Sequence, residues 1–195
     1  MRVFLTVLVL IFSLQSWTKA EDISDFEIEG IGIGDSLLDF FSINEIESRI
    51  VKEYYKYKSD KKFVAAEFYD KPFFEIYKDG IQIHIKSNDK KYKIYGISGN
   101  VWYEKNINDC YKKQKEIDKD LSNTFKNAER QFVSKSKHQA DKSGKSNVTY
   151  VTYWFKSGDY VSIDCTDWSI QMSPRTDNLS VSLITKELND WLISD

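Results

Sequence analysis

The chain has 195 residues, with 28 Lys and Arg against 30 Asp and Glu, a formal net charge of −2 and 15% aromatic residues. This length suits one large domain or two small, closely packed ones, and the mildly acidic balance gives no support to nucleic-acid binding. The apolar content is sufficient for a core that folds without help, so we expect no cofactor.

Residues 1–20 have the pattern of an export signal. The almost unbroken apolar run from Val3 to Leu14 is shorter than the roughly 18 to 20 residues that cross a bilayer. Thr18 and Ala20 are small residues at the two positions that a signal peptidase recognises. We therefore expect a mature chain starting at Glu21, without a membrane span, that is exported to the periplasm or secreted.

Cys110 and Cys165 are the only two cysteines. Exported proteins fold in an oxidising compartment, so we predict a disulfide between them. No Cys-x-x-Cys motif is present, which favours a structural bond over redox chemistry. Closing a loop of this size stabilises a fold by roughly 4 kcal/mol in the chain-entropy model.

The early mature chain predicts two short helices. Asp35 or Ser36 can cap a single turn through Phe41, and Ser42 followed by Glu45 is a capping box for a second helix. The glycines at 30, 32 and 34 lack the spacing of a dinucleotide-binding motif.

Strands follow in the first half. Lys62 to Tyr69 reads as a strand, and Phe73 to Lys78 with Ile81 to Lys86 reads as a hairpin around the turn Asp79-Gly80. This hairpin places Glu75 opposite His84 on a solvated face, where the carboxylate should raise the pKa of the imidazole slightly. Two further strands are expected at 92–97 and 101–104.

A long amphipathic helix is predicted from Ile107 to Phe132, because its apolar residues recur at helical spacing and lysines and aspartates occupy the other side. The segment from Ser134 to Asn147 reads as a solvated basic loop. The lysines between Lys135 and Lys145 leave open whether this loop contacts an anionic partner.

A second hairpin joins Val148–Phe155 to Tyr160–Cys165 across residues 156–159. Its expected register places Trp154, Val161, Ile163 and Cys165 on one face and Tyr153, Phe155 and Tyr160 on the other. Alternating residues predict two more strands, at 168–172 and 179–183, and Thr185 caps a last helix.

The order of elements predicts an α+β fold of antiparallel meanders, with about eight strands and with the long helix and shorter helices packed on one face. It is a single domain over 21–195. The order also suggests two loosely repeated halves, 21–105 and 106–195, in each of which helices precede a meander.

The run Ile28-Glu29-Gly30-Ile31-Gly32-Ile33-Gly34-Asp35-Ser36-Leu37-Leu38-Asp39-Phe40-Phe41-Ser42 resembles the start of a family of small uncharacterised exported proteins of marine bacteria. The resemblance extends over nearly the whole chain, through Cys110-Tyr111-Lys112-Lys113-Gln114 and Asn189-Asp190-Trp191-Leu192. It implies export and no activity, ligand or catalytic residue.

Candidate catalytic and metal-binding residues are few. The two histidines, His84 and His138, lie in different predicted elements, and Asp159, Asp164 and Asp167 neither share a face nor match a calcium loop. We therefore expect no catalytic site and no metal site.

The predicted second hairpin carries large side chains on both faces, and only one face can take the long helix. The predicted disulfide assigns the Cys165 face to that helix, because bonded cysteines need α-carbons within about 7 Å. Tyr153, Phe155 and Tyr160 then form a candidate binding face. This favours a non-catalytic binding or envelope-assembly module whose partner is another envelope or secreted protein. The alternative is a small exported carrier of an apolar or amphipathic ligand.

Overall fold

The computed structural model describes residues 22–194 except 70 and 105, and the predicted export signal lies outside this range. Seven antiparallel strands form one sheet, in the order β3-β4-β5-β9-β8-β7-β6. Their bounds are β3 Phe63–Phe68, β4 Ile81–Lys86, β5 Ile94–Trp102, β6 Glu129–Lys137, β7 Asn147–Trp154, β8 Tyr160–Asp167 and β9 Asn178–Ile184. A two-stranded ribbon comprises β1 Glu27–Ile28 and β2 Ile31–Gly32.

Three α-helices and three single 3₁₀ turns complete the described chain. They are η1 Ile23–Asp25, η2 Leu37–Asp39, α1 Ile43–Arg49, α2 Ile107–Thr124, η3 Ile170–Met172 and α3 Lys186–Ile193. The predicted caps are confirmed: Ser36, Ser42 and Thr185 accept hydrogen bonds from the backbone N–H groups of Leu38, Glu45 and Leu188. None of the described helices is long and apolar enough to span a bilayer.

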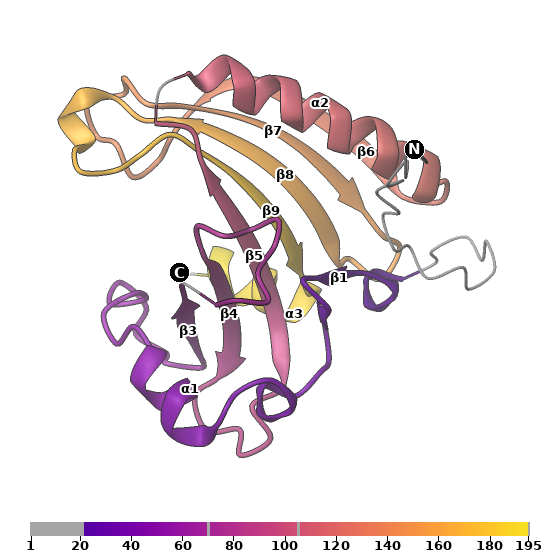
Figure 1. Ribbon diagram of the computed structural model, residues 1–195, viewed down its shortest axis with the longest axis vertical. Coiled ribbons are helices and arrows are strands. Elements are labelled where there is room, and N and C mark those ends of the chain that lie inside the picture. The colour runs from indigo at the N-terminus through magenta and orange to yellow at the C-terminus, as the bar shows by residue number, and fades with distance from the viewer. Residues whose placement is uncertain (1–21, 70, 105, 195) are drawn as a thin grey trace, which may run out of the picture.

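The α+β class and the antiparallel sheet are confirmed. Helices lie on both faces of the sheet, however, and not on one. Helix α2 packs on β8 and β9, whereas α3 lies behind β5 and β9 in the view of Figure 1. Each helix covers its own cluster of buried side chains, so the domain has a large core on the α2 face and a small one under α3.

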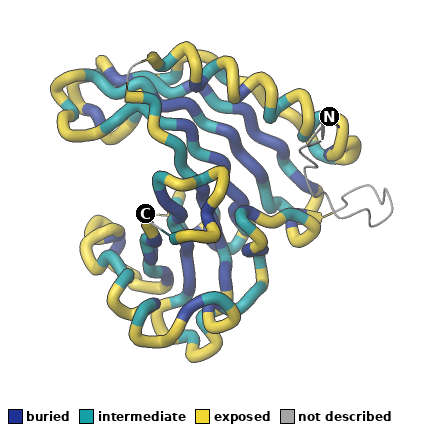
Figure 2. Tube along the Cα trace, in the orientation of Figure 1, coloured by how far each residue is buried: buried dark blue, intermediate teal, exposed yellow. Residues whose placement is uncertain are grey.

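The large core contains the buried residues of the sheet face that meets α2. Val151, Ile163 and Leu179 are each at most 2% exposed there, and the N-terminal segment extends the cover with Ile31 and Leu37. Figure 2 shows the dark blue, buried stretches running along the strands beneath the yellow, solvent-facing side of α2. At roughly 25 cal/mol per Å² of apolar surface, this burial is the main stabilising contribution.

The predicted disulfide is confirmed between Cys110 on α2 and Cys165 on β8, whose α-carbons are 6.0 Å apart. Both cysteines are fully buried. Next to the bond, the Gln114 amide donates to the backbone oxygens of Thr149 and Ile163 at 2.8 and 2.6 Å. The helix is therefore attached to the sheet by covalent and polar contacts as well as by apolar packing.

The long helix is shorter than predicted. It ends at Thr124, and β6 begins at Glu129. Phe125 is the C-cap residue, where a ψ of 63° ends the helix, and its ring is buried against Phe26 and Phe155, with ring centroids 4.3 and 5.0 Å away. The spacing of Ala128 and Phe132 continues the helical period by coincidence.

The predicted hairpin around Asp79-Gly80 is wrong. Strand β4 pairs with β3 and β5, and the segment 73–78 is not a strand. The carboxylate of Glu29 explains the difference, because it accepts the backbone N–H groups of Ile76 and Tyr77 at 2.7 and 2.8 Å and so holds them away from a ladder. Glu75 consequently does not face His84.

Two other strand predictions are also wrong. The strands expected at 92–97 and 101–104 are one continuous strand, β5, whose Gly99 lies under the ring of Tyr77. Residues 168–172 include the turn η3 instead of a strand. The strand predicted at Ile81–Lys86 is confirmed as β4, and the strands predicted near β3, β7, β8 and β9 are confirmed as well.

The register of the second hairpin differs by one residue from the prediction. Trp154 pairs with Tyr160, Tyr153 with Val161 and Thr149 with Cys165. The turn has three residues, because Phe155 donates to Asp159 O at 2.9 Å and Gly158 adopts a φ of +87°. A one-residue shift moves every side chain of β7 to the other face relative to β8.

This shift overturns the candidate binding face. Tyr153 and Phe155 are 1% and 6% exposed beneath α2, and Tyr160 lies on the opposite face. The Tyr153 hydroxyl donates to a carboxylate oxygen of Asp118 on α2 at 2.6 Å. Tyr153 and Phe155 therefore belong to the core.

Replacing Phe155 by Ser is expected to destabilise the domain by about 3 to 5 kcal/mol, because it leaves a cavity and a buried hydroxyl. Ile170→Ser is the control, since Ile170 is 83% exposed; its cost should be below about 1 kcal/mol. Urea unfolding measures both. Equal effects of the two substitutions would contradict this placement of Phe155.

Candidate functional site: the polar face of the sheet

The sheet face opposite α2 carries a line of polar side chains across the strands. The backbone registers align Glu67, Gln82, Ser98, Ser182, Ser162 and Thr152. A second line, two residues along each strand, contains Asn100, Ser180, Asp164 and Tyr150. We call these ten residues the polar face.

Hydroxyl groups form the floor of the polar face. Ser98 and Ser182 are hydrogen-bonded at 2.8 Å, and Ser180 and Ser182 at 3.4 Å. Small side chains keep this floor close to the backbone, and Asn100, Ser180 and Tyr150 remain partly exposed. Ser98, Ser182, Ser162 and Thr152 are at most 9% exposed, so the floor is recessed. It is rich in groups that can both donate and accept hydrogen bonds.

Asp164 lies in the middle of this floor and is partly buried. The hydroxyl of Ser162 donates to its carboxylate at 3.2 Å, and none of the ion pairs found among the described residues includes it. Burial raises the pKa of Asp164 to about 7, with the Ser162 hydrogen bond opposing the shift. Such an uncompensated carboxyl is a recognised mark of a functional site.

Aromatic side chains border the polar face. Trp154 and Tyr160 pack together with ring centroids 4.6 Å apart at the end nearest α3. Tyr54, which is 41% exposed, donates its hydroxyl to Gln82 at 3.0 Å, and Trp102, which is 49% exposed, marks the end farthest from α3. The border is thus apolar and partly solvent-facing, around a polar centre.

Two loops at the strand ends farthest from α3 are tied together. Asp141 accepts the backbone N–H groups of Ser143 and Ser146 at 2.8 and 2.9 Å and the hydroxyl of Ser169 at 2.9 Å. These hydrogen bonds hold the pKa of Asp141 well below its usual range. The predicted basic loop is therefore shorter and more ordered than expected: β6 includes Lys135 and Lys137, and Asp141 organises the rest.

Both histidines are engaged in packing. His84 is 4% exposed, and its Nδ1 lies 2.7 Å from the hydroxyl of Tyr55. His138 packs on Trp168 with ring centroids 4.2 Å apart. Burial lowers the pKa of His84 to about 4, which is opposite to the predicted direction. The misplaced Glu75 explains this error, because no carboxylate stabilises the charged imidazole.

The described residues contain no group of three or more His, Cys, Asp or Glu side chains that could hold a metal ion. Two surface depressions have volumes of about 550 and 330 Å³. Both are lined mainly by charged or polar side chains, so neither supports the hypothesis of an apolar carrier.

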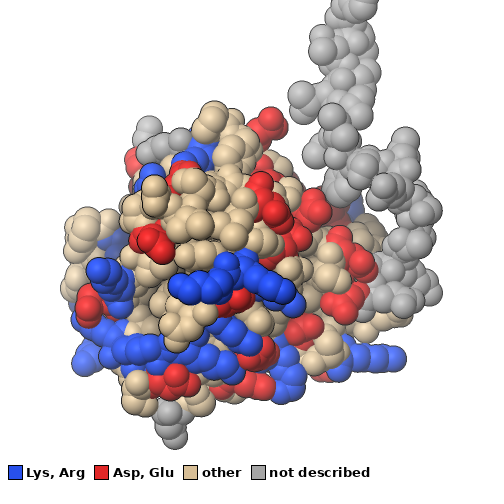
Figure 3. Space-filling model, turned by 90° about the horizontal axis from the view of Figure 1, so that it is seen from below, with Lys and Arg blue, Asp and Glu red and all other residues tan. Residues whose placement is uncertain are grey.

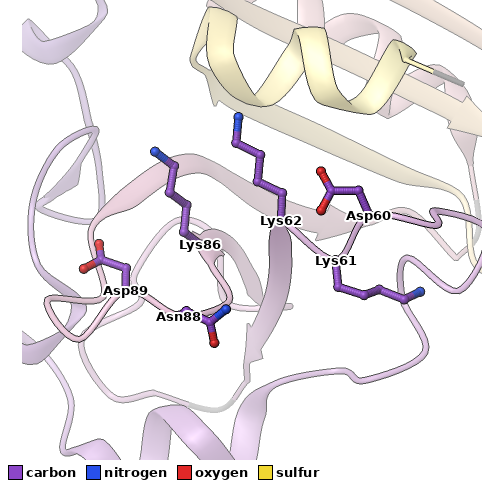
Figure 4. Close-up of a pocket in the computed structure, with 6 residues that line it drawn as sticks. All are labelled: Asp60, Lys61, Lys62, Lys86, Asn88 and Asp89. Carbon is purple, nitrogen blue, oxygen red and sulfur yellow. The ribbon is translucent and has the colours of Figure 1, made fainter.

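The larger depression lies within a lysine-rich part of the surface. Figure 3, seen from below, shows lysine and arginine side chains gathered on the lower face of the molecule, with acidic residues among them. Lys62 and Lys86 point toward α3 (Figure 4), where Glu187 forms ion pairs with them at 3.0 and 2.9 Å. Since Asp60 and Asp89 also line the depression, its charges are largely balanced.

Comparisons with protein-family models, with curated proteins and with solved structures found no match to the chain. The resemblance to exported proteins of marine bacteria therefore stays a prediction, and the function rests on the geometry of the polar face.

The stability of the Asp164→Asn variant tests the environment of Asp164. The folded protein keeps this carboxyl protonated up to about pH 7, whereas the unfolded chain loses the proton near pH 4. The wild type therefore loses stability as the pH rises from 4 to 7, and the neutral amide does not. At pH 8 the variant should be more stable by about 1 to 2 kcal/mol, less than the pKa alone implies because the side chain is partly exposed.

Chemical denaturation at pH 8 and pH 4 measures this difference. The matched control is Asp167→Asn, which changes a carboxyl of the same strand on the other sheet face. Equal stability of wild type and Asp164→Asn at pH 8 would show that Asp164 is well solvated.

His84 predicts a separate dependence on pH. The unfolded chain takes up a proton near pH 6.5, but the folded protein does so only near pH 4. Stability should therefore fall by up to about 3 kcal/mol as the pH drops from 6.5 to 4, and His84→Gln should remove most of this slope. An NMR titration that placed the His84 pKa above 6.5 would refute the buried environment.

Proposed function

We propose that the protein is a non-catalytic binding module, exported to the periplasm or secreted, that recognises another protein through the polar face. A basic side chain of the partner would lie against Asp164. The observation that carries the proposal is the partly buried Asp164 carboxyl at the centre of the face, which the described residues provide with one hydroxyl and no cation.

The energetics of Asp164 support a cationic partner. A buried charge without a counter-ion costs several kcal/mol, and the fold reduces this cost by keeping the carboxyl protonated. A lysine or arginine supplied by a partner would favour the ionised form. Binding would then offset part of the free-energy cost of ionising Asp164. This makes Asp164 a specificity determinant.

The shape and border of the face support a macromolecular partner. The floor is rich in hydroxyl groups, and neither of the two depressions is lined by the polar-face residues. Tyr54, Trp102, Trp154 and Tyr160 surround it, and tyrosine and tryptophan are enriched where protein interfaces have their strongest contacts.

Two further features support the rest of the proposal. Both histidines are held in packing contacts, so neither is placed as the base of a nucleophile. The Cys110–Cys165 disulfide is compatible with an oxidising compartment outside the cytoplasm.

Partner capture with surface variants tests the proposal. The mature protein is used as bait for envelope and secreted proteins of its own cell, and captured proteins are quantified by mass spectrometry. Asp164→Lys should lose a specific partner at least tenfold, because two cations would meet, whereas Asp167→Asn should retain it. A partner that both variants retain equally would place the binding surface elsewhere.

The affinity for that partner should depend on pH. A basic group binds the ionised carboxylate, and below about pH 7 forming that ion requires release of a proton. The Kd should therefore rise up to tenfold for each pH unit from 7 down to 5. With Asp164→Asn the Kd should be weaker and nearly independent of pH, as titration calorimetry would show. A wild-type Kd that stays constant over this range would exclude a charge pair at Asp164.

A further inference from the structure

The two edges of the seven-stranded sheet differ in their protection. Beyond β3, Ile50 forms a bridge with Ala66, and Val51 donates to Ala65 O at 2.9 Å, so the segment after α1 covers that edge. On the other edge, β6 pairs with β7 alone among the described strands. An edge strand carries a row of backbone N–H and C=O groups that can pair with another strand.

The open edge is divided by an irregularity. The register of β6 shifts between Val133 and Ser136, and Lys135 has a φ of +54°. Such a bulge, followed by Lys137, is a common device against edge-to-edge pairing. It leaves the five residues Glu129–Val133 as a regular edge in unbroken register with β7.

The regular edge is complementary to itself. In an antiparallel pair with its two-fold axis at Gln131, Glu129 faces Val133 of the second copy, Arg130 faces Phe132, and Gln131 faces its own equivalent. The segment has one acid and one base, so two copies do not repel each other. The longer strand would add two lysines from each copy beyond the bulge.

The side chains of this segment favour the same arrangement. Phe132 is 52% exposed, and the guanidinium of Arg130 is held in place by two hydrogen bonds of 2.7 Å to the carboxylate of Asp118 on α2. Phe132 pairs with Val151 and Arg130 pairs with Tyr153. Since Val151 and Tyr153 face α2, the side chains of Phe132 and Arg130 lie on the same side of the sheet. Facing residues in adjacent strands lie about 5 Å apart, which brings each Phe132 ring next to a guanidinium of the other copy.

From these observations we infer that Glu129–Val133 is a self-association edge, through which two copies of the chain join their sheets antiparallel about a two-fold axis at Gln131. The axis is perpendicular to the sheet, so both polar faces lie on the same side of the joined sheet. The inference is independent of the proposed partner, but a dimer would present that partner with two binding sites.

Sedimentation velocity over a range of protein concentrations tests self-association. The wild type should show a reversible monomer–dimer equilibrium at micromolar concentrations. Phe132→Lys should weaken dimerisation at least tenfold, because a lysine would face Arg130 of the second copy. Ile193→Lys is the matched control, since Ile193 is 72% exposed on α3, which packs on β5; it should dimerise like the wild type.

Cysteine substitution tests the register. Gln131→Cys places two thiols across the two-fold axis with α-carbons about 4.5 to 5.5 Å apart, which permits a disulfide. Mild oxidation should cross-link this variant, and peptide mapping should locate the new bond at 131. Ser134→Cys should not cross-link, because its equivalent lies several residues away along the paired strands.

Two results would overturn the inference. One is a wild-type protein that remains monomeric at millimolar concentration. The other is a dimer that persists in Phe132→Lys while Gln131→Cys fails to cross-link, which would place the contact on another surface. If this edge pairs only with a different protein, the isolated wild type stays monomeric, and the inference is wrong.

Discussion

The pairing of β5 with β9 is the contact on which the architecture depends. Strand β5 ends the first meander and β9 ends the second, and seven residue pairs from Gly96–Ile184 to Trp102–Asn178 join them in the centre of the sheet. The last strand of the chain therefore lies in the middle. Without this ladder the two meanders would be separate small sheets, each with an additional open edge. The continuous registers across it also align the residues of the polar face.

Central strands differ in composition on their two faces, and this difference determines what each face can do. In β9, Leu179, Val181 and Leu183 face the core under α2, while Ser180 and Ser182 face the other way. The same alternation recurs in β8. A sheet needs only one apolar face for stability, so a line of serines on the second face indicates contact with water or with a polar surface. Near α3 the second face becomes apolar again, because Leu188 packs close to Gly96.

Much of the local structure could be predicted from the sequence. The caps at Ser42 and Thr185, the disulfide, and the strands at or near β3, β4, β7, β8 and β9 follow from residue types and short-range spacing. The failures have long-range or turn-specific causes. Glu29 prevents a hairpin 47 residues later in the chain by accepting the N–H of Ile76, and no local pattern records this contact.

The candidate site was missed for a related reason. A four-residue turn was assumed after Phe155, whereas the positive φ of Gly158 permits a three-residue turn and shifts the register by one residue. The shift moved Tyr153 and Phe155 into the core and brought Thr152 and Tyr150 beside Ser162 and Asp164, which the predicted register also places on the face away from α2. Reading Gly158 as the left-handed residue of a short turn would have given the correct faces. The alternating serines of β9 were a second available signal.

The two unusual titrating groups show how a structural polar residue differs from a functional one. His84 is buried next to the Tyr55 hydroxyl, and the neutral imidazole that burial favours is also the form present near pH 7. Asp164 is different, because near pH 7 its environment opposes the charge that the carboxyl normally carries. An asparagine of almost the same shape would avoid this cost. A carboxyl whose burial opposes its own charge is best explained by a gain made elsewhere, and the polar face is where a partner can provide it.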